Sequence, residues 1–313
     1  MKILVLGGSG FIGSYLVEQL VSDGHSVRVF DRCLEKFHTP LAEVDYQIAQ
    51  FGNALVRAKA LEGIDTVYHL ISTTVPSTSI LNPIADIEDN LIPTIGFFEQ
   101  MVKAGVKRII YMSSGGAVYG NPEKVPISES HPLHPICPYG VTKIAVENYL
   151  LMYQKLYGLL PIILRPSNAY GPRQGHLGVQ GVIATFLYNI IRDKPLEVWG
   201  NGSVIRDYLY VEDLVKLCIV AGNSNHTGIF NVGSGRGYSI SSVIKIISDI
   251  VGKKIKVIYH SGRQFDVRNT ELDITKVKKT FNWSAKVSLK DGIKKHWLWV
   301  SEMANQGRNE YFE

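Results

Sequence analysis

Short apolar runs alternate with longer amphipathic segments along the first half of the chain. Three- and four-residue hydrophobic spacing predicts helices at 11–20, 83–104 (despite Pro93) and 139–157. Short, nearly continuous apolar runs predict strands that are buried on both faces, at 2–6, 26–30, 46–49, 66–70, 108–112 and 160–164. The alternation of strands and helices indicates an α/β fold built on a doubly wound parallel sheet.

The rhythm changes after about residue 166. Turn-rich stretches separate shorter elements, and helices are predicted at 182–192, 211–221, 241–251 and 273–281, with a last helix from a Ser288 cap to about Met303. No proline- or serine-rich linker and no long run of charges divides the two parts. We therefore expect residues 1–166 to form the main domain and residues 167–313 a smaller C-terminal α/β lobe packed on it, without a sharp boundary.

The composition excludes several classes of protein. With 45% hydrophobic residues and a net charge of +5 over 313 residues, the chain is an ordinary globular one rather than a disordered one. The three cysteines suit a reducing, cytoplasmic location and cannot form a disulfide scaffold. The apolar start is interrupted by Gly7 and Gly8, which argues against a signal peptide, and no apolar run is long enough to cross a membrane. No basic run with interleaved aromatic residues indicates nucleic-acid binding.

A glycine motif follows the first predicted strand and opens the first helix. Gly7, Gly10 and Gly13 have the spacing that lets backbone approach a pyrophosphate at a helix N-terminus, which is typical of a Rossmann-type dinucleotide site. Asp31 ends the second strand, where a carboxylate accepts hydrogen bonds from the adenosine ribose hydroxyls. A carboxylate repels a 2′-phosphate, so NAD is favoured, although the adjacent Arg32 leaves NADP open.

Tyr139 and Lys143 form the candidate catalytic pair. Their spacing places both on one face of the predicted helix 139–157. They follow a strand that ends in Ser113 and Ser114, where the cleft of a parallel sheet opens. A nearby ammonium and the positive charge of a nicotinamide would lower the pKa of the tyrosine, so that its phenolate could remove a hydroxyl proton. We expect no metal ion in this site.

With these motifs, the sequence resembles the extended short-chain dehydrogenase/reductase family, particularly the nucleotide-sugar epimerases of the UDP-galactose 4-epimerase type. The resemblance covers nearly the whole chain. It is carried by residues 7–13, Asp31, the Ser-Ser-Gly-Gly-Ala-Val-Tyr-Gly segment 113–120, residues 138–140 with Lys143, residues 165–174, residues 206–208 with Val211 and Asp213, and residues 262–273. It implies a nucleotide-binding first domain and a sugar-nucleotide-binding lobe.

The resemblance also implies roles for individual residues. Lys143 would hold the nicotinamide ribose as well as assist Tyr139. Arg206 and Arg263 would clamp the substrate diphosphate, for which the fixed fork of arginine donors is suited. Further cofactor contacts would come from Phe11, Ile12, Gln50, Phe51 at the adenine, Leu70 and Pro166. Further substrate contacts would come from Gly115, from Asn168 near the diphosphate, and from Asp266, which would orient Arg263 or touch a ribose.

The chain departs from the family pattern at two places. Gly115 stands where the catalytic Ser or Thr is usual, so either Ser114 or Ser113 reaches the sugar oxygen through a shifted loop, or Tyr139 works without that hydrogen bond. Gln50 stands where an acidic residue usually precedes the adenine contact, and its amide oxygen could accept from the adenine amine. In addition, residues 116–117 are Gly-Ala where dehydratases carry an Asp-Glu pair, which argues against dehydration.

These observations favour an NAD-dependent 4-epimerase of a UDP-hexose or UDP-N-acetylhexosamine that acts through a transient 4-keto sugar. The alternative is an NAD(P)H-dependent 4-ketoreductase of a dTDP- or UDP-4-keto-6-deoxy sugar. A non-catalytic NAD-binding protein is a third hypothesis, which the intact Tyr139 and Lys143 argue against. The helices at 83–104 and 139–157 resemble the pair through which the family forms homodimers. We expect His69 to be a core residue.

Overall fold

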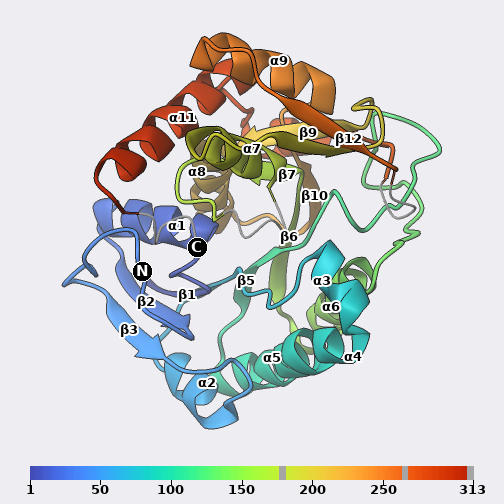
Figure 1. Cartoon of the computed structure of the whole chain (residues 1–313). Coiled ribbons are helices and arrows are strands. Elements are labelled where there is room, and N and C mark those ends of the chain that lie inside the picture. Colours follow the sequence, from blue (N-terminus) through green and yellow to red (C-terminus); the bar gives the residue numbers. More distant parts are fainter. Residues whose placement is uncertain (176–180, 263–266, 309–313) are drawn as a thin grey trace.

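The main sheet has seven parallel strands. The computed structural model describes residues 1–175, 181–262 and 267–308. The strand order is β10-β6-β5-β4-β1-β2-β3, as Figure 1 shows. The strands are β1 (Lys2–Leu6), β2 (Ser26–Asp31), β3 (Asp45–Ile48), β4 (Thr66–His69), β5 (Arg108–Met112), β6 (Leu160–Pro166) and β10 (Gly228–Val232). The predicted α/β fold with a doubly wound parallel sheet is therefore confirmed.

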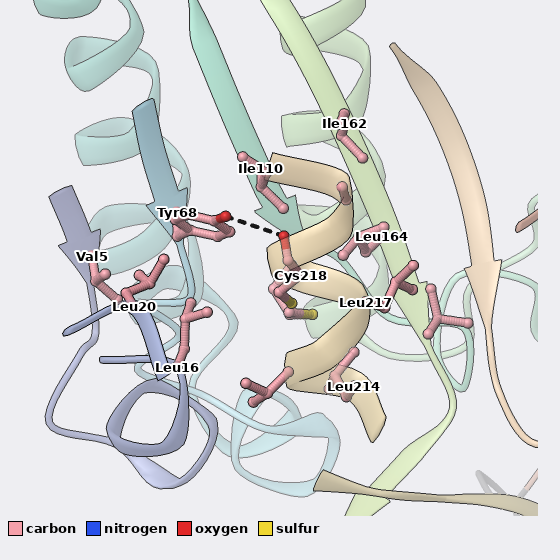
Figure 2. Packing of buried hydrophobic residues seen from close by; sticks show 14 of the residues in the cluster. Val5, Leu16, Leu20, Tyr68, Ile110, Ile162, Leu164, Leu214, Leu217 and Cys218 are labelled. Carbon is pink, nitrogen blue, oxygen red and sulfur yellow. Dashed lines mark hydrogen bonds between the residues drawn. The ribbon is translucent and has the colours of Figure 1, made fainter. Parts of the chain in front are cut away.

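Helices cover both faces of this sheet, which explains why its strands are apolar throughout. On one face lie α1 (Phe11–Ser22) and α8 (Val211–Gly222), and on the other lie α2 (Ala54–Ala60), α5 (Ile92–Ala104) and α6 (Pro138–Tyr157). Figure 2 shows the first face, where Leu214 and Leu217 of α8 pack against the strands. The Tyr68 hydroxyl of β4 donates a hydrogen bond to the Cys218 carbonyl of α8 at 3.1 Å.

The C-terminal lobe has a core of its own. Its helices are α7 (Val182–Ile191), α9 (Ile240–Val251) and α11 (Leu289–Asn305), whereas α10 (Thr275–Phe281) packs against α8 and the edge strand β10 of the large sheet. Its strands form one small sheet around β9 and one two-stranded sheet. These strands are β7 (Asn168–Tyr170), β8 (Leu196–Trp199), β9 (Ile205–Tyr210), β11 (Gly237–Ser239), β12 (Val257–His260) and β13 (Asn269–Thr270). Side chains of α7, α9 and α11 pack together in this core.

The two parts of the chain interleave. Strand β10 comes from the C-terminal part, yet it is the edge strand of the large sheet and pairs with β6 in parallel. Helix α8 also comes from that part and packs on the sheet beside α1. The proposed division at residue 166 therefore separates two stretches of sequence that share one sheet.

The predicted helix 83–104 is interrupted. It consists of α4 (Pro83–Asp86), a π-helical turn η1 (Ile87–Leu91) and α5. Pro93 lies in the first turn of α5 and has no N–H to donate to the preceding turn, so the regular hydrogen-bond ladder breaks there. Helices α2 and α3 (Pro76–Leu81) were not predicted, because each is too short to show a clear period. Within the described residues, no helix has the length and apolarity needed to span a bilayer.

Candidate active site

Tyr139 and Lys143 meet at the carboxyl ends of the central strands. Both lie on α6, whose N-terminal turn is next to the ends of β4 and β5. They line a pocket at this edge of the sheet. The pocket is formed by His69, Ile71, Ser72, Asp86, Asn90, Thr94, Tyr111, Tyr139, Thr142, Lys143 and Val146. Because parallel strands all end at this edge, residues far apart in the sequence converge on one place.

Tyr139 has a hydroxyl partner. The side chain of Ser114 forms a hydrogen bond with that of Tyr139, while the Tyr139 backbone N–H donates to Ser79 Oγ at 3.1 Å. Burial raises the pKa of the Tyr139 phenol above its usual value, and the bond with Ser114 acts in the opposite direction. The sequence predicted a lowered pKa, so within the chain itself burial outweighs the groups that favour the phenolate.

Lys143 is buried with its ammonium held against the sheet. Its Nζ donates to the Met112 carbonyl of β5 at 2.8 Å and lies 5.4 Å from the centre of the Tyr139 ring. Burial lowers the pKa of Lys143 to about 8, although the charges of Asp86 and Glu147 act to raise it. The helical spacing thus brings the ammonium to the phenol, as the sequence predicted.

The two candidate serines have different surroundings. Ser113 is buried, and its hydroxyl donates to the Glu147 carboxylate. Glu147 is in turn held by Arg165, which donates from Nε at 3.0 Å and from Nη2 at 2.5 Å. Ser113 therefore belongs to a buried structural network, and the structure brings only Ser114 to Tyr139. Of the two serines predicted to reach the sugar oxygen, Ser114 is therefore the one that lies at Tyr139, and its contact with the sugar stays a prediction.

Gly115 occupies a place where the usual hydroxyl residue does not fit. A Cβ there would lie 2.6 Å from Leu272 Cδ1 and 2.9 Å from the Arg165 carbonyl oxygen. The Gly115 N–H also donates to the Pro166 carbonyl at 2.8 Å, which holds the loop against β6. At Gly116, by contrast, a Cβ would have no neighbour within 4 Å. The path of the backbone at residue 115 therefore leaves room for glycine only, which explains why the chain departs from the family pattern there.

The glycine loop forms a cradle for a pyrophosphate. Gly7 has φ +82°, and a Cβ at Gly13 would lie 2.1 Å from the Gly7 carbonyl oxygen, so neither position accepts a side chain. Helix α1 starts at Phe11 with Gly10 as its N-cap, which leaves N–H groups at the helix start. Within the described part of the chain, the buried Ser9 hydroxyl has no hydrogen-bond partner. This unsatisfied donor and the tight loop fit a dinucleotide.

Asp31 connects this loop to the end of β2. Its Oδ2 accepts from the Ser9 N–H at 3.0 Å and its Oδ1 from the Arg32 N–H at 2.7 Å. Burial raises the pKa of Asp31, against the lowering effect of these N–H groups. The carboxylate is placed beside the glycine loop, where the prediction of a ribose contact requires it.

The other predicted cofactor residues differ in how far they are exposed. Phe11, Ile12 and Leu70 are partly buried around the loop, Pro166 is buried and Gln50 is exposed. Phe51 is only 7% exposed, and its ring packs edge-on against His69 at 5.3 Å between centroids. The Phe51 ring is therefore a core group, and only its backbone is left for an adenine.

Asn168 and Arg206 lie on neighbouring strands of the lobe. Asn168 of β7 donates from Nδ2 to the Asp207 carbonyl at 3.0 Å, and Arg206 of β9 donates from Nη1 to the Ile205 carbonyl at 2.9 Å and to the Val267 carbonyl at 2.5 Å. Parallel pairing of β7 with β9 brings them together. Arg263 and Asp266 lie outside the described residues.

Three further polar residues that line the pocket, Asp86, Asn90 and Thr142, were not predicted. Asp86 and Asn90 are four residues apart, but the neighbouring Glu88 and Asp89 hide this spacing in the sequence. His69 also lines the pocket, and burial lowers its pKa to about 3, so it is neutral at physiological pH.

Comparison with known proteins places this geometry in a family. The model of the "NAD dependent epimerase/dehydratase family" matches residues 3–233. A putative UDP-glucose 4-epimerase of Methanocaldococcus jannaschii is 34% identical over 95% of this chain and 98% of its own length. A dTDP-4-dehydro-6-deoxyglucose reductase of Escherichia coli is 32% identical over 94% of this chain and 95% of its own.

Solved structures agree with the sequence comparisons. A UDP-glucose 4-epimerase of Thermotoga maritima with UDP-glucose superposes with a TM-score of 0.93 at 34% identity, over 97% of this chain and 100% of the other. A Thermus thermophilus UDP-glucose 4-epimerase in complex with NAD gives 0.91 at 31% identity, over 96% and 99%. The resemblance drawn from the motifs is confirmed: this chain belongs to the NAD-dependent epimerase/dehydratase family.

Proposed function

We propose that the chain is an NAD-dependent 4-epimerase of a UDP-hexose, with or without an N-acetyl group. The observation that carries this proposal is the hydrogen bond between Ser114 and Tyr139 beside the buried Lys143 ammonium, in a pocket at the carboxyl ends of the sheet. Relatives and structural neighbours named as UDP-glucose 4-epimerases support the reaction and the substrate class. The neighbour in complex with NAD supports the cofactor.

In this mechanism Tyr139 acts as the base for the 4-hydroxyl proton. Ser114 shares a hydrogen bond with the phenol and is placed to steady the sugar oxygen. Lys143 supplies the positive charge that favours the phenolate. NAD, held by the glycine loop and Asp31, would supply the hydride acceptor for C4. Tyr139 would return the proton to the sugar oxygen at the end. Because the hydride would be given back as well, the reaction would consume no NAD.

Asp31 supports NAD as the natural cofactor. Its carboxylate is fixed beside the glycine loop by the N–H groups of Ser9 and Arg32. A 2′-phosphate would meet this negative charge, whereas a ribose diol would donate to it. We propose the same glycine loop, from Gly7 to Gly13, as the pyrophosphate site and Asn168 and Arg206 as contacts to the substrate.

The decisive experiment is an assay of the purified chain on UDP-glucose, UDP-galactose and their 2-acetamido forms. We expect interconversion of one 4-epimeric pair with no net change in NADH absorbance. Tyr139→Phe should reduce turnover by about 10²- to 10⁴-fold, since general-base catalysis contributes that much. Tyr149→Phe, on the exposed side of the same helix, is the matched control. Failure to interconvert any of these pairs would refute the proposal.

A 4-ketoreductase is the second candidate, and Gly115 is the observation that favours it. The missing hydroxyl residue and the relative named as a dTDP-4-dehydro-6-deoxyglucose reductase both point in this direction. Such an enzyme would use Tyr139 as an acid that protonates the new hydroxyl. Stoichiometric consumption of NADH with a 4-keto-6-deoxy sugar nucleotide would distinguish it from the epimerase.

We also propose a cytoplasmic homodimer. Large apolar side chains are exposed on three neighbouring helices labelled in Figure 1, with Leu81 at 84%, Ile92 at 58% and Leu156 at 64% exposure. Helices α3, α5 and α6 carry them, and α6 contacts both of the others. Two copies that pack these helices together would cover this surface. The three cysteines have no disulfide partner in the structure, in keeping with a reducing compartment.

A further inference from the structure

A buried carboxylate lies beside the Tyr139–Lys143 pair. Asp86 is 1% exposed and lines the same pocket as both residues. It is the last residue of α4, directly before the π-helical turn η1. Through this irregular turn Asp86 and Asn90 are both buried, although the residues between them are exposed.

Neutral side chains from three segments surround the Asp86 carboxylate. Thr142 of α6 donates to Oδ2 at 2.5 Å, and Asn90 of η1 donates from Nδ2 to Oδ1 at 3.1 Å. The Thr74 hydroxyl, from the loop after β4, also donates to Oδ1. None of the salt bridges among the described residues includes Asp86. A buried carboxylate with only neutral donors needs a positive charge near it.

Among the described residues, the second acid that influences Lys143 is Glu147, which is already neutralised. Glu147 forms a two-pronged ion pair with Arg165, with Nη2 and Oε2 2.5 Å apart. Asp86 is also the stronger of the two influences on the pKa of Lys143, and both raise it.

The remaining titratable groups around Lys143 are neutral. His69 has its pKa lowered to about 3, and burial raises the pKa values of Tyr111 and Cys137. The Tyr111 ring centre lies 5.0 Å from Lys143 Nζ. The pocket therefore holds one buried cation and one buried anion that have no other charged partner among these groups.

We propose that Asp86 is the internal counter-ion of Lys143, a positioning residue that keeps the ammonium charged beside Tyr139. The proposal rests on the proposed role of Tyr139 as the base. Asp86 acts on the pair in two ways. Its charge stabilises the Lys143 ammonium, and it opposes formation of the Tyr139 phenolate, because it raises the pKa of both groups. Together these effects set the pH range in which Tyr139 is deprotonated while Lys143 is protonated.

The test is the pH profile of kcat/KM for Asp86→Asn, which keeps the shape of the side chain and removes its charge. We expect both limbs of the profile to move to lower pH by about one unit, since loss of the carboxylate lowers the pKa of both the phenol and the ammonium. Asp86→Ser provides the same charge removal in a smaller side chain if Asp86→Asn does not fold. Asp86→Glu, which keeps the charge, should leave the limbs near their wild-type positions.

Asp89→Asn is the matched control, because Asp89 lies on η1 and is exposed. The two limbs of the kcat/KM pH profile of Asp89→Asn should stay at their wild-type positions. A second readout needs no sugar substrate: the ultraviolet absorbance of the Tyr139 phenolate in the NAD-loaded protein, taken as the difference from Tyr139→Phe. The pH at the midpoint of the phenolate titration should also be lower in Asp86→Asn than in the wild type. Unmoved limbs and an unmoved midpoint, with only a lower thermal stability, would overturn the counter-ion role. A shifted midpoint without turnover of UDP-hexoses would overturn only the proposed function.

Discussion

At the scale of single residues, neighbours in the sequence have unrelated roles because the loop after β5 turns sharply. Ser113 points into the buried network of Glu147 and Arg165, and Ser114 bonds to Tyr139. Gly115 then passes against the carbonyl of Arg165. The direction of the backbone therefore gives these three consecutive residues different surroundings and different roles.

Ser114→Ala and Ser113→Ala should separate activity from stability. Ser114→Ala should lower kcat by about 10- to 100-fold with little change in melting temperature, because it removes a hydrogen bond to the base. Ser113→Ala should lower the free energy of unfolding by about 1–3 kcal/mol, because it takes a donor from a buried carboxylate. Thermal unfolding and steady-state kinetics on both variants measure the split. Equal kinetic losses would contradict the assignment.

Gly115→Ser should not restore the hydroxyl of the family pattern. The new Cβ would press on Leu272 and on backbone, so we expect a loss of about 1–3 kcal/mol in stability. Gly116→Ser is the matched control, since its Cβ has open space and its stability should stay within about 0.5 kcal/mol. Denaturant unfolding provides the measurement. A stable Gly115→Ser variant with higher turnover would show that the loop can move aside.

At the scale of elements, the chain after residue 166 completes the large sheet. Phe230 of β10 pairs with Leu164 of β6, and α8 provides Leu214 and Leu217 to the core beside α1. Without these elements β6 would become an exposed edge and one face of the sheet would lose much of its cover. We therefore expect residues 1–166 to depend on the rest of the chain for folding.

A fragment of residues 1–166 should accordingly lack a cooperative unfolding transition. It exposes apolar surface of Leu16 and Leu164 that α8 covers in the whole chain. Near-ultraviolet circular dichroism during heating, with the full chain as reference, measures this. A sharp transition in the fragment would mean that the first 166 residues form an independent domain.

The sequence predicted most of these elements but not their partners. Every strand predicted before residue 166 is present, because continuous apolar runs between turns have few other interpretations. Strand β10 was missed, since Gly228–Val232 is a short run whose place at the sheet edge depends on tertiary pairing. In the site, Tyr139 and Lys143 were proposed from their place after the glycine motif and the Ser113-Ser114 strand end, and their catalytic roles stay a prediction. Asp86 was not predicted, because its burial in an irregular helical turn leaves no periodic signal.

At the scale of the whole molecule, two histidines that are buried in the described part of the chain connect stability to pH. His69 lies under the pocket and His296 in the lobe, and burial lowers the pKa of each to about 3 from an ordinary 6.5. An unfolded chain would bind protons at both, whereas the folded one excludes them. Their stabilising effect is therefore complete above pH 6.5 and is lost as the pH falls toward 3.

Replacing His296 should flatten the acid side of the stability curve. In His296→Leu we expect the free energy of unfolding to fall less between pH 6.5 and pH 4 than in the wild type, by about 2–3 kcal/mol. The exposed His226 provides the control, because His226→Leu should keep the wild-type slope. Urea unfolding at a series of pH values measures both. Parallel curves for all three proteins would contradict the assignment.

The shared sheet also anchors the chain of the lobe. Because β10 is hydrogen-bonded to β6 and Tyr119 donates to Asn231 of β10 at 2.6 Å, the segments that lead from β10 into the lobe start from a fixed strand. We therefore expect a sugar-nucleotide substrate to be admitted and released through movement of these connecting segments, while β10 stays paired with β6.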